Sequence, residues 1–137
     1  MKIYADKIVG SAQHALSISE VKRILKAIPA EWLDGLSETH LSNSSESGPR
    51  AFFNKHDKTF TIHSCGSTPS ETLKIILSEL AAVHLGYTTR HWHRLSKTEK
   101  SRIEKITQPF LDELLHIVTS KQKRFIQVPT PAFQRVI

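Results

Sequence analysis

The sequence predicts an α+β domain, and three observations support that fold class. Two segments carry apolar residues at helical spacing directly after a helix-start signal, and a third helix-start signal lies near residue 96. Two short runs of β-branched and aromatic residues flank a polar link between the first two helices. We therefore expect a leading helix, a small antiparallel sheet of two to three strands, a long central helix and a C-terminal helix or kinked helix pair.

The first helix is expected to begin after Ser17, which with Glu20 has the spacing of a capping box. Apolar residues then follow at i, i+3, i+4 and i+7, namely Val21, Ile24, Leu25 and Ile28. Pro29 ends the helix because proline offers no backbone N–H. Residues 1–16 show no strong period, so no element is predicted there. Trp32 and Leu33 are expected in a short turn packed on the core.

The sheet is expected from three segments after this turn. Residues 36–42 are predicted as a strand with Leu36 and Leu41 as its apolar anchors, followed by a polar loop over 42–49. Residues 51–53 and 59–63 are predicted to form a hairpin. In its second strand Phe60 and Ile62 share one face, and Thr59, Thr61 and His63 share the other.

The central helix is the most strongly marked element. Thr68 is a favourable N-cap, Pro69 occupies the tolerated first position, and Glu71 completes a capping box. Gly86 supplies the C-terminal signal. The apolar face between these ends is broad, so the helix is expected to lie centrally.

The C-terminal part of the chain is expected to contain a helix and a tail. Ser96 and Glu99 form a third capping box, and Pro109 is predicted to kink or restart the helix that follows. Residues 1–120 are taken as one domain, and residues 121–137 as a basic, proline-containing tail in extended conformation.

Composition supports a globular protein, with 39% hydrophobic and 23% charged residues among 137. No apolar run approaches the ~20 residues of a membrane span, and the N-terminal segment lacks the apolar stretch of a signal peptide. A cytoplasmic location is expected. The single cysteine, Cys65, excludes an internal disulfide and a cysteine-based zinc cluster.

The order of these elements, the turn I-P-x-x-W-L-x-G-L at 28–36 and the helical segment S-E-L-A-A-V-H-L-G at 78–86 resemble the minimal zincin metallopeptidase domain of small bacterial and phage proteins. The resemblance implies a central helix carrying H-E-x-x-H-x-x-G. Its two histidines would bind zinc from one helix face, and its glutamate would act as the general base.

Both histidine positions of that motif differ in this chain, since they hold Ser78 and Ala82. Glu79 and Gly86 match. His84 is rotated by roughly 200° from Ala82 and cannot replace the lost ligand. The resemblance therefore implies a catalytically inactive domain without a cofactor, in which Glu79 is a vestige and the function is to bind a protein or regulate. A lone glutamate in an apolar helix also has a structural interpretation, in which it bonds to an arginine, a tyrosine or a backbone group.

Two alternatives remain open at this point. A net charge of +6 and a pI near 9.6 favour a polyanionic partner, so a nucleic-acid-binding protein is the second hypothesis. Its expected contacts combine aromatic and basic residues of the 87–102 segment and the tail: Tyr87, Arg90, Trp92, Arg94, Lys97, Lys121, Lys123 and Arg124. The third hypothesis is an active metalloenzyme with an unorthodox site built from His84, His91, His93 and a carboxylate, although exposed histidines in a basic loop explain the same pattern.

Overall fold

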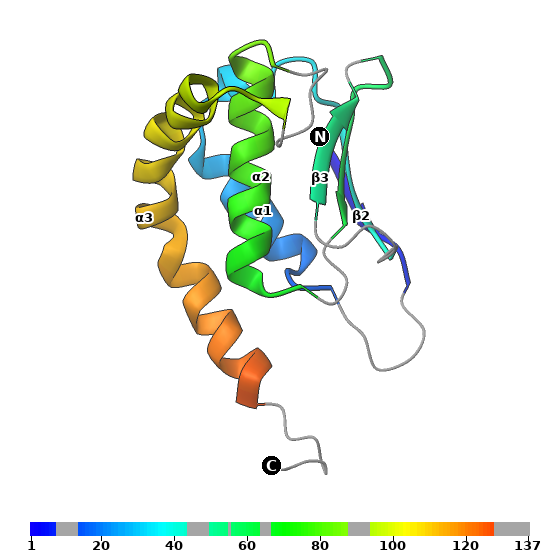
Figure 1. Cartoon of the computed structure of the whole chain (residues 1–137). Helices are drawn as coiled ribbons and strands as arrows, with labels where there is room; N and C mark the ends of the chain where they lie inside the picture. Colours follow the sequence, from blue (N-terminus) through cyan, green and yellow to red (C-terminus); the bar gives the residue numbers. More distant parts are fainter. Residues whose placement is uncertain (8–13, 44–49, 55, 64–66, 88–93, 128–137) are drawn as a thin grey trace.

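The structure, a computed structural model, is an α+β fold with its helices gathered on one face of a four-stranded sheet (Figure 1). It describes residues 1–7, 14–43, 50–54, 56–63, 67–87 and 94–127, with the backbone alone for 119–127. The elements are β1 (Lys2–Ala5), α1 (Ile18–Ala27), the 3₁₀ helix η1 (Ala30–Leu33), β2 (Glu38–Ser42), β3 (Arg50–Asn54), β4 (Thr59–His63), α2 (Pro69–His84) and α3 (Lys97–Gln127). Within these ranges, no helix has both the length and the apolar character that crossing a membrane requires.

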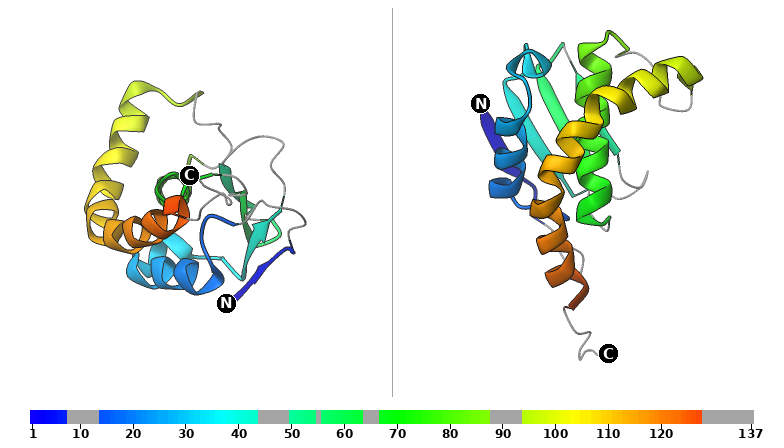
Figure 2. Two further views of the ribbon diagram at one scale, coloured as in Figure 1. Left: turned by 90° about the horizontal axis from the view of Figure 1, so that it is seen from below. Right: turned by 90° about the vertical axis from the view of Figure 1, so that its left-hand side faces the viewer.

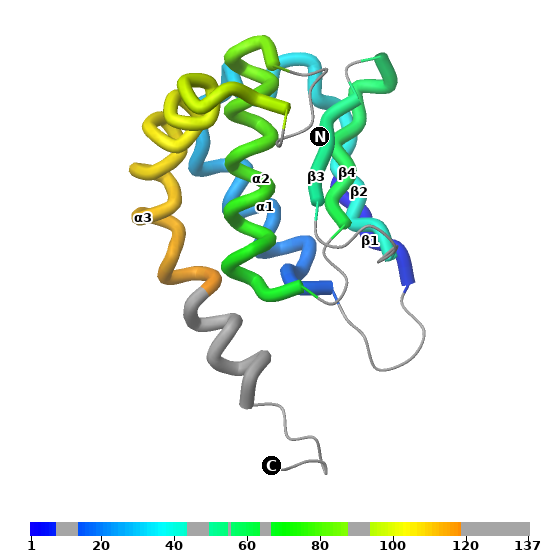
Figure 3. Tube along the Cα trace, in the orientation of Figure 1, coloured from blue at the N-terminus to red at the C-terminus, as the bar shows by residue number. Residues whose placement is uncertain are grey.

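The sheet differs from the expected one in size and in direction. Its strand order is β1-β2-β4-β3, and β2 is parallel to both β1 and β4 (Figure 3). Only the hairpin of β3 and β4 is antiparallel, as predicted. The prediction of a purely antiparallel sheet of two to three strands was therefore wrong. Parallel neighbours need a crossover connection, which α1 and η1 supply between β1 and β2.

Strand β1 had no sequence prediction at all. It is four residues long, too short for a period to stand out, and it is stabilised by pairing with the distant β2, Tyr4 opposite His40. The strand predicted at 36–42 begins at Glu38, so Leu36 lies outside it. Ser37 instead forms a turn contact, with its N–H donating to the Lys58 carbonyl at 2.9 Å.

The first two helices confirm their predicted ends. The Ser17 N–H donates to Glu20 Oε1 at 2.8 Å and the Glu20 N–H donates to Ser17 Oγ at 3.1 Å, which completes the capping box of α1. Thr68 and Glu71 make the same reciprocal pair at α2. Gly86 follows α2 with a φ of +87°, a conformation that glycine adopts without strain.

The core lies between the sheet and the helices. Phe60 and Ile62 of β4 and Leu41 of β2 are fully buried on one face of the sheet. The helices add their apolar stripes, among them Val21, Ile24, Leu73, Ile76, Leu77 and Leu80. Helix α2 packs on both β3 and α3, so its predicted central position is confirmed (Figure 1). Trp32 of η1 is buried and meets the Phe110 ring edge-on, with centroids 5.1 Å apart.

Helix α3 is one continuous helix rather than a pair. It contains Pro109 and changes direction along its length (Figure 2), as expected where a proline removes one N–H from the ladder. Its start carries the predicted capping box, since the Glu99 N–H donates to Ser96 Oγ at 3.1 Å. It continues to Gln127, so residues 121–127 are helical and not extended as predicted for the tail. Residues 128–137 lie outside the described part.

Candidate functional site

The candidate site is the face of the sheet turned away from the helices, because side chains alternate between the two faces of a strand. We call this surface the open sheet face. Of the described part of the chain, no helix covers this face (Figure 2). It comprises Lys2, Tyr4, Glu38, His40, Ser42, Arg50, Phe52, Asn54, Thr59, Thr61 and His63.

The open sheet face carries two pairs of stacked rings. Tyr4 and His40 have ring centroids 4.7 Å apart and planes inclined by 16°. Phe52 and His63 have centroids 5.3 Å apart and planes inclined by 24°. The strand register aligns Tyr4, His40, Thr61 and Phe52 in one row across all four strands, so Tyr4 and Phe52 lie at opposite ends of that row, and His63 lies in the adjacent row with Arg50.

Each ring pair has a cation beside it. Lys2 Nζ lies 5.4 Å from the Tyr4 ring centroid, and the Arg50 guanidinium carbon lies 5.4 Å from that of Phe52. Both distances are within the range of cation–π attraction. Phe52 remains 38% exposed, which is high for an aromatic ring in a sheet and leaves it available to a ligand. The pKa of Tyr4 is raised, first by burial and then by the Glu38 carboxylate, so its hydroxyl stays a neutral donor at physiological pH.

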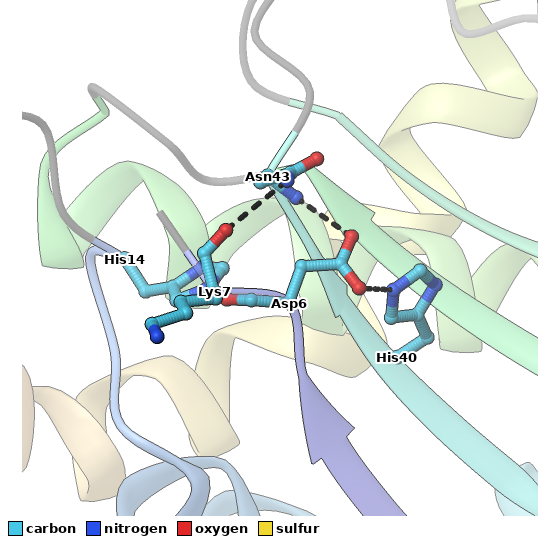
Figure 4. Close-up of polar contacts among 5 residues, drawn as sticks. All are labelled: Asp6, Lys7, His14, His40 and Asn43. Atoms are coloured by element: carbon cyan, nitrogen blue, oxygen red, sulfur yellow. Dashed lines mark hydrogen bonds and ion pairs between the residues drawn. The ribbon is translucent and has the colours of Figure 1, made fainter. Parts of the chain in front are cut away.

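At the carboxyl ends of β1 and β2, Asp6 connects the two parallel strands (Figure 4). Its Oδ1 accepts from His40 Nε2 at 2.7 Å, and its Oδ2 accepts from the Asn43 N–H at 3.2 Å. The hydrogen bond from His40 is the largest of the effects that lower the pKa of Asp6. Because Asp6 holds Nε2, it fixes the orientation of the His40 ring under Tyr4.

His14 closes this cluster from the α1 side. Its Nε2 lies 2.8 Å from the Asp6 main-chain carbonyl, which can only accept, so Nε2 carries the proton. Its Nδ1 is buried and has no hydrogen-bond partner in the described chain. The cluster therefore links the residue His14, before α1, to the sheet, and among the described residues its Nδ1 acceptor has no partner.

No protein-family model, curated protein or solved structure matches this chain.

The zincin-like frame lies on α2, on the other side of the sheet. Ser78 is half-buried and Ala82 is buried, and neither side chain can serve as an effective zinc ligand. Glu79 is half-buried and its Oε2 accepts from the Phe53 N–H of β3 at 3.0 Å. A backbone group is one of the partners expected if the glutamate is structural.

Burial raises the pKa of the Glu79 carboxyl, while the Phe53 N–H and then the Arg50 charge oppose that rise. The hydrogen bond joins α2 to the outer strand β3 at a backbone donor that does not face β4. This contact agrees with the structural interpretation of Glu79, in which a backbone group was one of the expected partners.

The remaining metal candidates are only partly within the described chain. His84 is exposed and stacks on Trp32, with centroids 5.9 Å apart, whereas Ala82 is buried. His91 and His93 lie outside the described residues. Among the residues that are described, no group of three or more histidine, cysteine, aspartate or glutamate side chains is placed to hold a metal ion.

The predicted nucleic-acid contacts are likewise only partly described. Tyr87 is half-buried and its hydroxyl oxygen accepts from Arg102 Nη1 at 3.4 Å. Arg94 and Lys97 are exposed beside the start of α3. Arg90 and Trp92 lie outside the described residues. For Lys121, Lys123 and Arg124 the structure gives a helical backbone and no side-chain placement.

Sequence reasoning missed the residues that make the open sheet face distinctive. Tyr4 and Lys2 were missed with β1. Phe52 was placed in the hairpin but not assigned a face, although its alternation with the buried Phe53 indicates one. His63 was correctly placed opposite Phe60 and Ile62, but the ring that it stacks on comes from another strand and only the register reveals it.

Proposed function

We propose that this protein is a nucleic-acid-binding domain that contacts its ligand with the open sheet face. The observation that carries the proposal is the pair of ring stacks on a sheet face that none of the described helices covers, each with a cation beside it. Rings offer flat surfaces to bases, and cations offer charge to phosphates. A net charge of +6 supports attraction to a polyanion over longer distances.

The location differs from the one that the sequence suggested. The 87–102 segment supplies cations in Arg94 and Lys97, but Tyr87 is the aromatic residue of that group within the described chain. The open sheet face combines four rings, two cations, the Glu38 carboxylate and several hydroxyl groups on one sheet. We therefore assign the primary contact to this face and a secondary, electrostatic contact to the 87–102 segment.

The test is a fluorescence-anisotropy titration of labelled oligonucleotides with the full chain at several salt concentrations. We expect binding at low salt and a linear fall of log K with log salt concentration. Arg50→Gln should reduce that slope by roughly one unit if Arg50 contacts a phosphate. Lys97→Gln removes the same charge from the other surface and is the matched control, with a smaller expected change in affinity.

Two results would contradict the proposal. One is the absence of binding at low salt to oligonucleotides of every form tested. The other is an affinity that Arg50→Gln leaves unchanged while Lys97→Gln lowers it strongly, because the contact would then lie at the 87–102 segment.

A second candidate is a catalytically inactive zincin-like domain that binds a protein partner. The observation in its favour is that the glutamate of the motif frame, Glu79, lies beside the outer strand β3, and an outer strand can pair with a partner's strand. Metal analysis of tag-free protein should then give zinc well below one atom per chain. Zinc at one atom per chain would contradict an inactive domain.

A further inference from the structure

We infer that the ligand of the open sheet face is a single-stranded nucleic acid whose bases stack at two positions, Phe52 with His63 and Tyr4 with His40. The inference rests on the proposed function and specifies the form of the ligand. It depends on ring geometry, whereas the proposed function also depends on charge.

The rings of the open sheet face need access to the planes of the bases. In a duplex, each base plane is covered by its stacked neighbours, so a ring on a protein surface reaches it only when the strand is unpaired. The rings of the open sheet face stand on strands and not on a helix or loop that enters a groove. Phe52 is 38% exposed, and the other rings in its row across the sheet are those of Tyr4 and His40.

The two cations beside the rings can bind the phosphates of the same strand. In the free protein, Arg50 and Lys2 each lie 5.4 Å from the centroid of a ring. Both side chains are long and lie at the surface, so each can leave the ring for a phosphate when a base arrives. One base and one phosphate are thereby bound at each position, which is the repeat unit of a strand.

The distance between the Tyr4 and Phe52 positions suits a strand that contacts both. Tyr4 and Phe52 occupy the first and last strands of one row, three inter-strand steps apart. Neighbouring strands are about 4.7–4.9 Å apart, so the two positions are separated by about 14 Å. Asp6 holds the His40 ring through its 2.7 Å hydrogen bond, which keeps the Tyr4 position in place before the ligand binds. A strand that spans both positions should bind more tightly than one that reaches a single position.

The experiment compares single-stranded DNA, single-stranded RNA and a duplex of the same sequence by anisotropy with the full chain. Phe52→Leu keeps an apolar side chain and removes the ring, and Phe52→Tyr is the matched control that keeps the ring. We expect the duplex to bind at least about tenfold more weakly than the single strands. Phe52→Leu should weaken single-strand binding about tenfold, and Phe52→Tyr by no more than about twofold. A Tyr4→Leu variant applies the same test to the other position.

The outcomes separate the two claims. Equal binding of duplex and single strand overturns the inference and leaves the proposed function standing. Single-strand binding that neither Phe52→Leu nor Tyr4→Leu weakens overturns the stacking positions. Binding of no nucleic acid overturns the proposed function itself. Circular dichroism of each variant establishes that it is folded, and Tyr4→Leu tests the loss of a ring at the other position if Phe52→Leu is not folded.

Discussion

The two faces of the sheet are built from alternate residues of the same strands and have opposite properties. On the inner face, Phe60 and Ile62 are fully buried under the helices. On the open face, Thr61 and His63 of that same strand stay partly exposed, and the neighbouring Phe52 is 38% exposed. The inner face is almost entirely aliphatic or aromatic, whereas the open face mixes rings, hydroxyls and charges.

The difference shows that the two faces of one strand contribute unequally to stability. Burying apolar area on the inner face stabilises the fold, at roughly 25 cal/mol per Å² removed from water. The open face contributes less to stability because its side chains keep much of their contact with water in the folded state. The same substitution should therefore change stability by different amounts on the two faces.

The largest expected effect comes from removing a ring on the inner face. Phe60→Ala should lower the free energy of unfolding by about 3–5 kcal/mol, because it leaves a cavity under α2. Phe52→Ala makes the same change on the open face and should cost less, about 1–2 kcal/mol, because its ring keeps part of its contact with water in the folded state. Urea unfolding followed by circular dichroism measures both. Similar losses for the two variants would mean that the open face is covered in solution.

The next effect concerns the hydrogen bond that fastens β3 to α2. Glu79→Ala leaves the Phe53 N–H without its acceptor and should cost about 1–2 kcal/mol. Glu79→Gln keeps an acceptor oxygen and should be close to neutral or slightly stabilising at pH 7. If the alanine and glutamine variants were equally unstable, the carboxylate charge and not the hydrogen bond would be the stabilising feature.

The pH dependence of Glu79 provides a further check on this contact. Its folded pKa lies above the ordinary 4.5, so the folded state binds the proton more tightly than the unfolded state. The wild type should therefore lose stability as pH rises from about 4.5 through the folded pKa, and Glu79→Gln should not. The stability of Glu79→Gln relative to wild type should increase over that range in urea titrations at successive pH values. A constant difference would contradict the raised pKa.

The smallest effect is expected at Asp6, on the open side of the sheet. The pH dependence of its contribution to stability has the opposite sign to that of Glu79. The folded pKa of Asp6 lies below its ordinary 3.8, so its contribution is present above that value and lost as pH falls through the folded pKa. Asp6→Asn should cost at most about 1 kcal/mol at pH 7, since the Asp6–His40 pair is partly solvated. The difference from wild type should disappear in acid. A loss that persists at low pH would indicate a packing role for Asp6.

Much of the fold was predictable because its signals are local. Three capping boxes, at Ser17, Thr68 and Ser96, gave the helix starts, and each is present in the structure. The hairpin of β3 and β4 was predictable because its strands lie close together in the sequence. The direction and number of the other strands were not, because β1 and β2 are paired across the whole of α1 and η1. Pro109 indicated a break, yet packing against α2 maintains one helix through it.

The candidate site was less predictable than the fold. The motif frame on α2 drew attention to Glu79, whose hydrogen bond to Phe53 depends on how β3 lies against that helix. The basic segment around Tyr87 was predictable as a continuous run of aromatic and basic residues. The open sheet face was not, because its rings come from strands that are neighbours only after the register is set.

The sequence by itself determined where the helices begin, which face of β4 is buried, and that the α2 segment has no pair of histidine zinc ligands. These properties depend on residues within a turn or two of one another, so spacing alone specifies them. The tertiary structure decided the mixed sheet, the backbone partner of Glu79 and the gathering of Tyr4, His40, Phe52 and His63 on one face. Those features depend on contacts between distant segments, which form only when burial of the core aligns the strands.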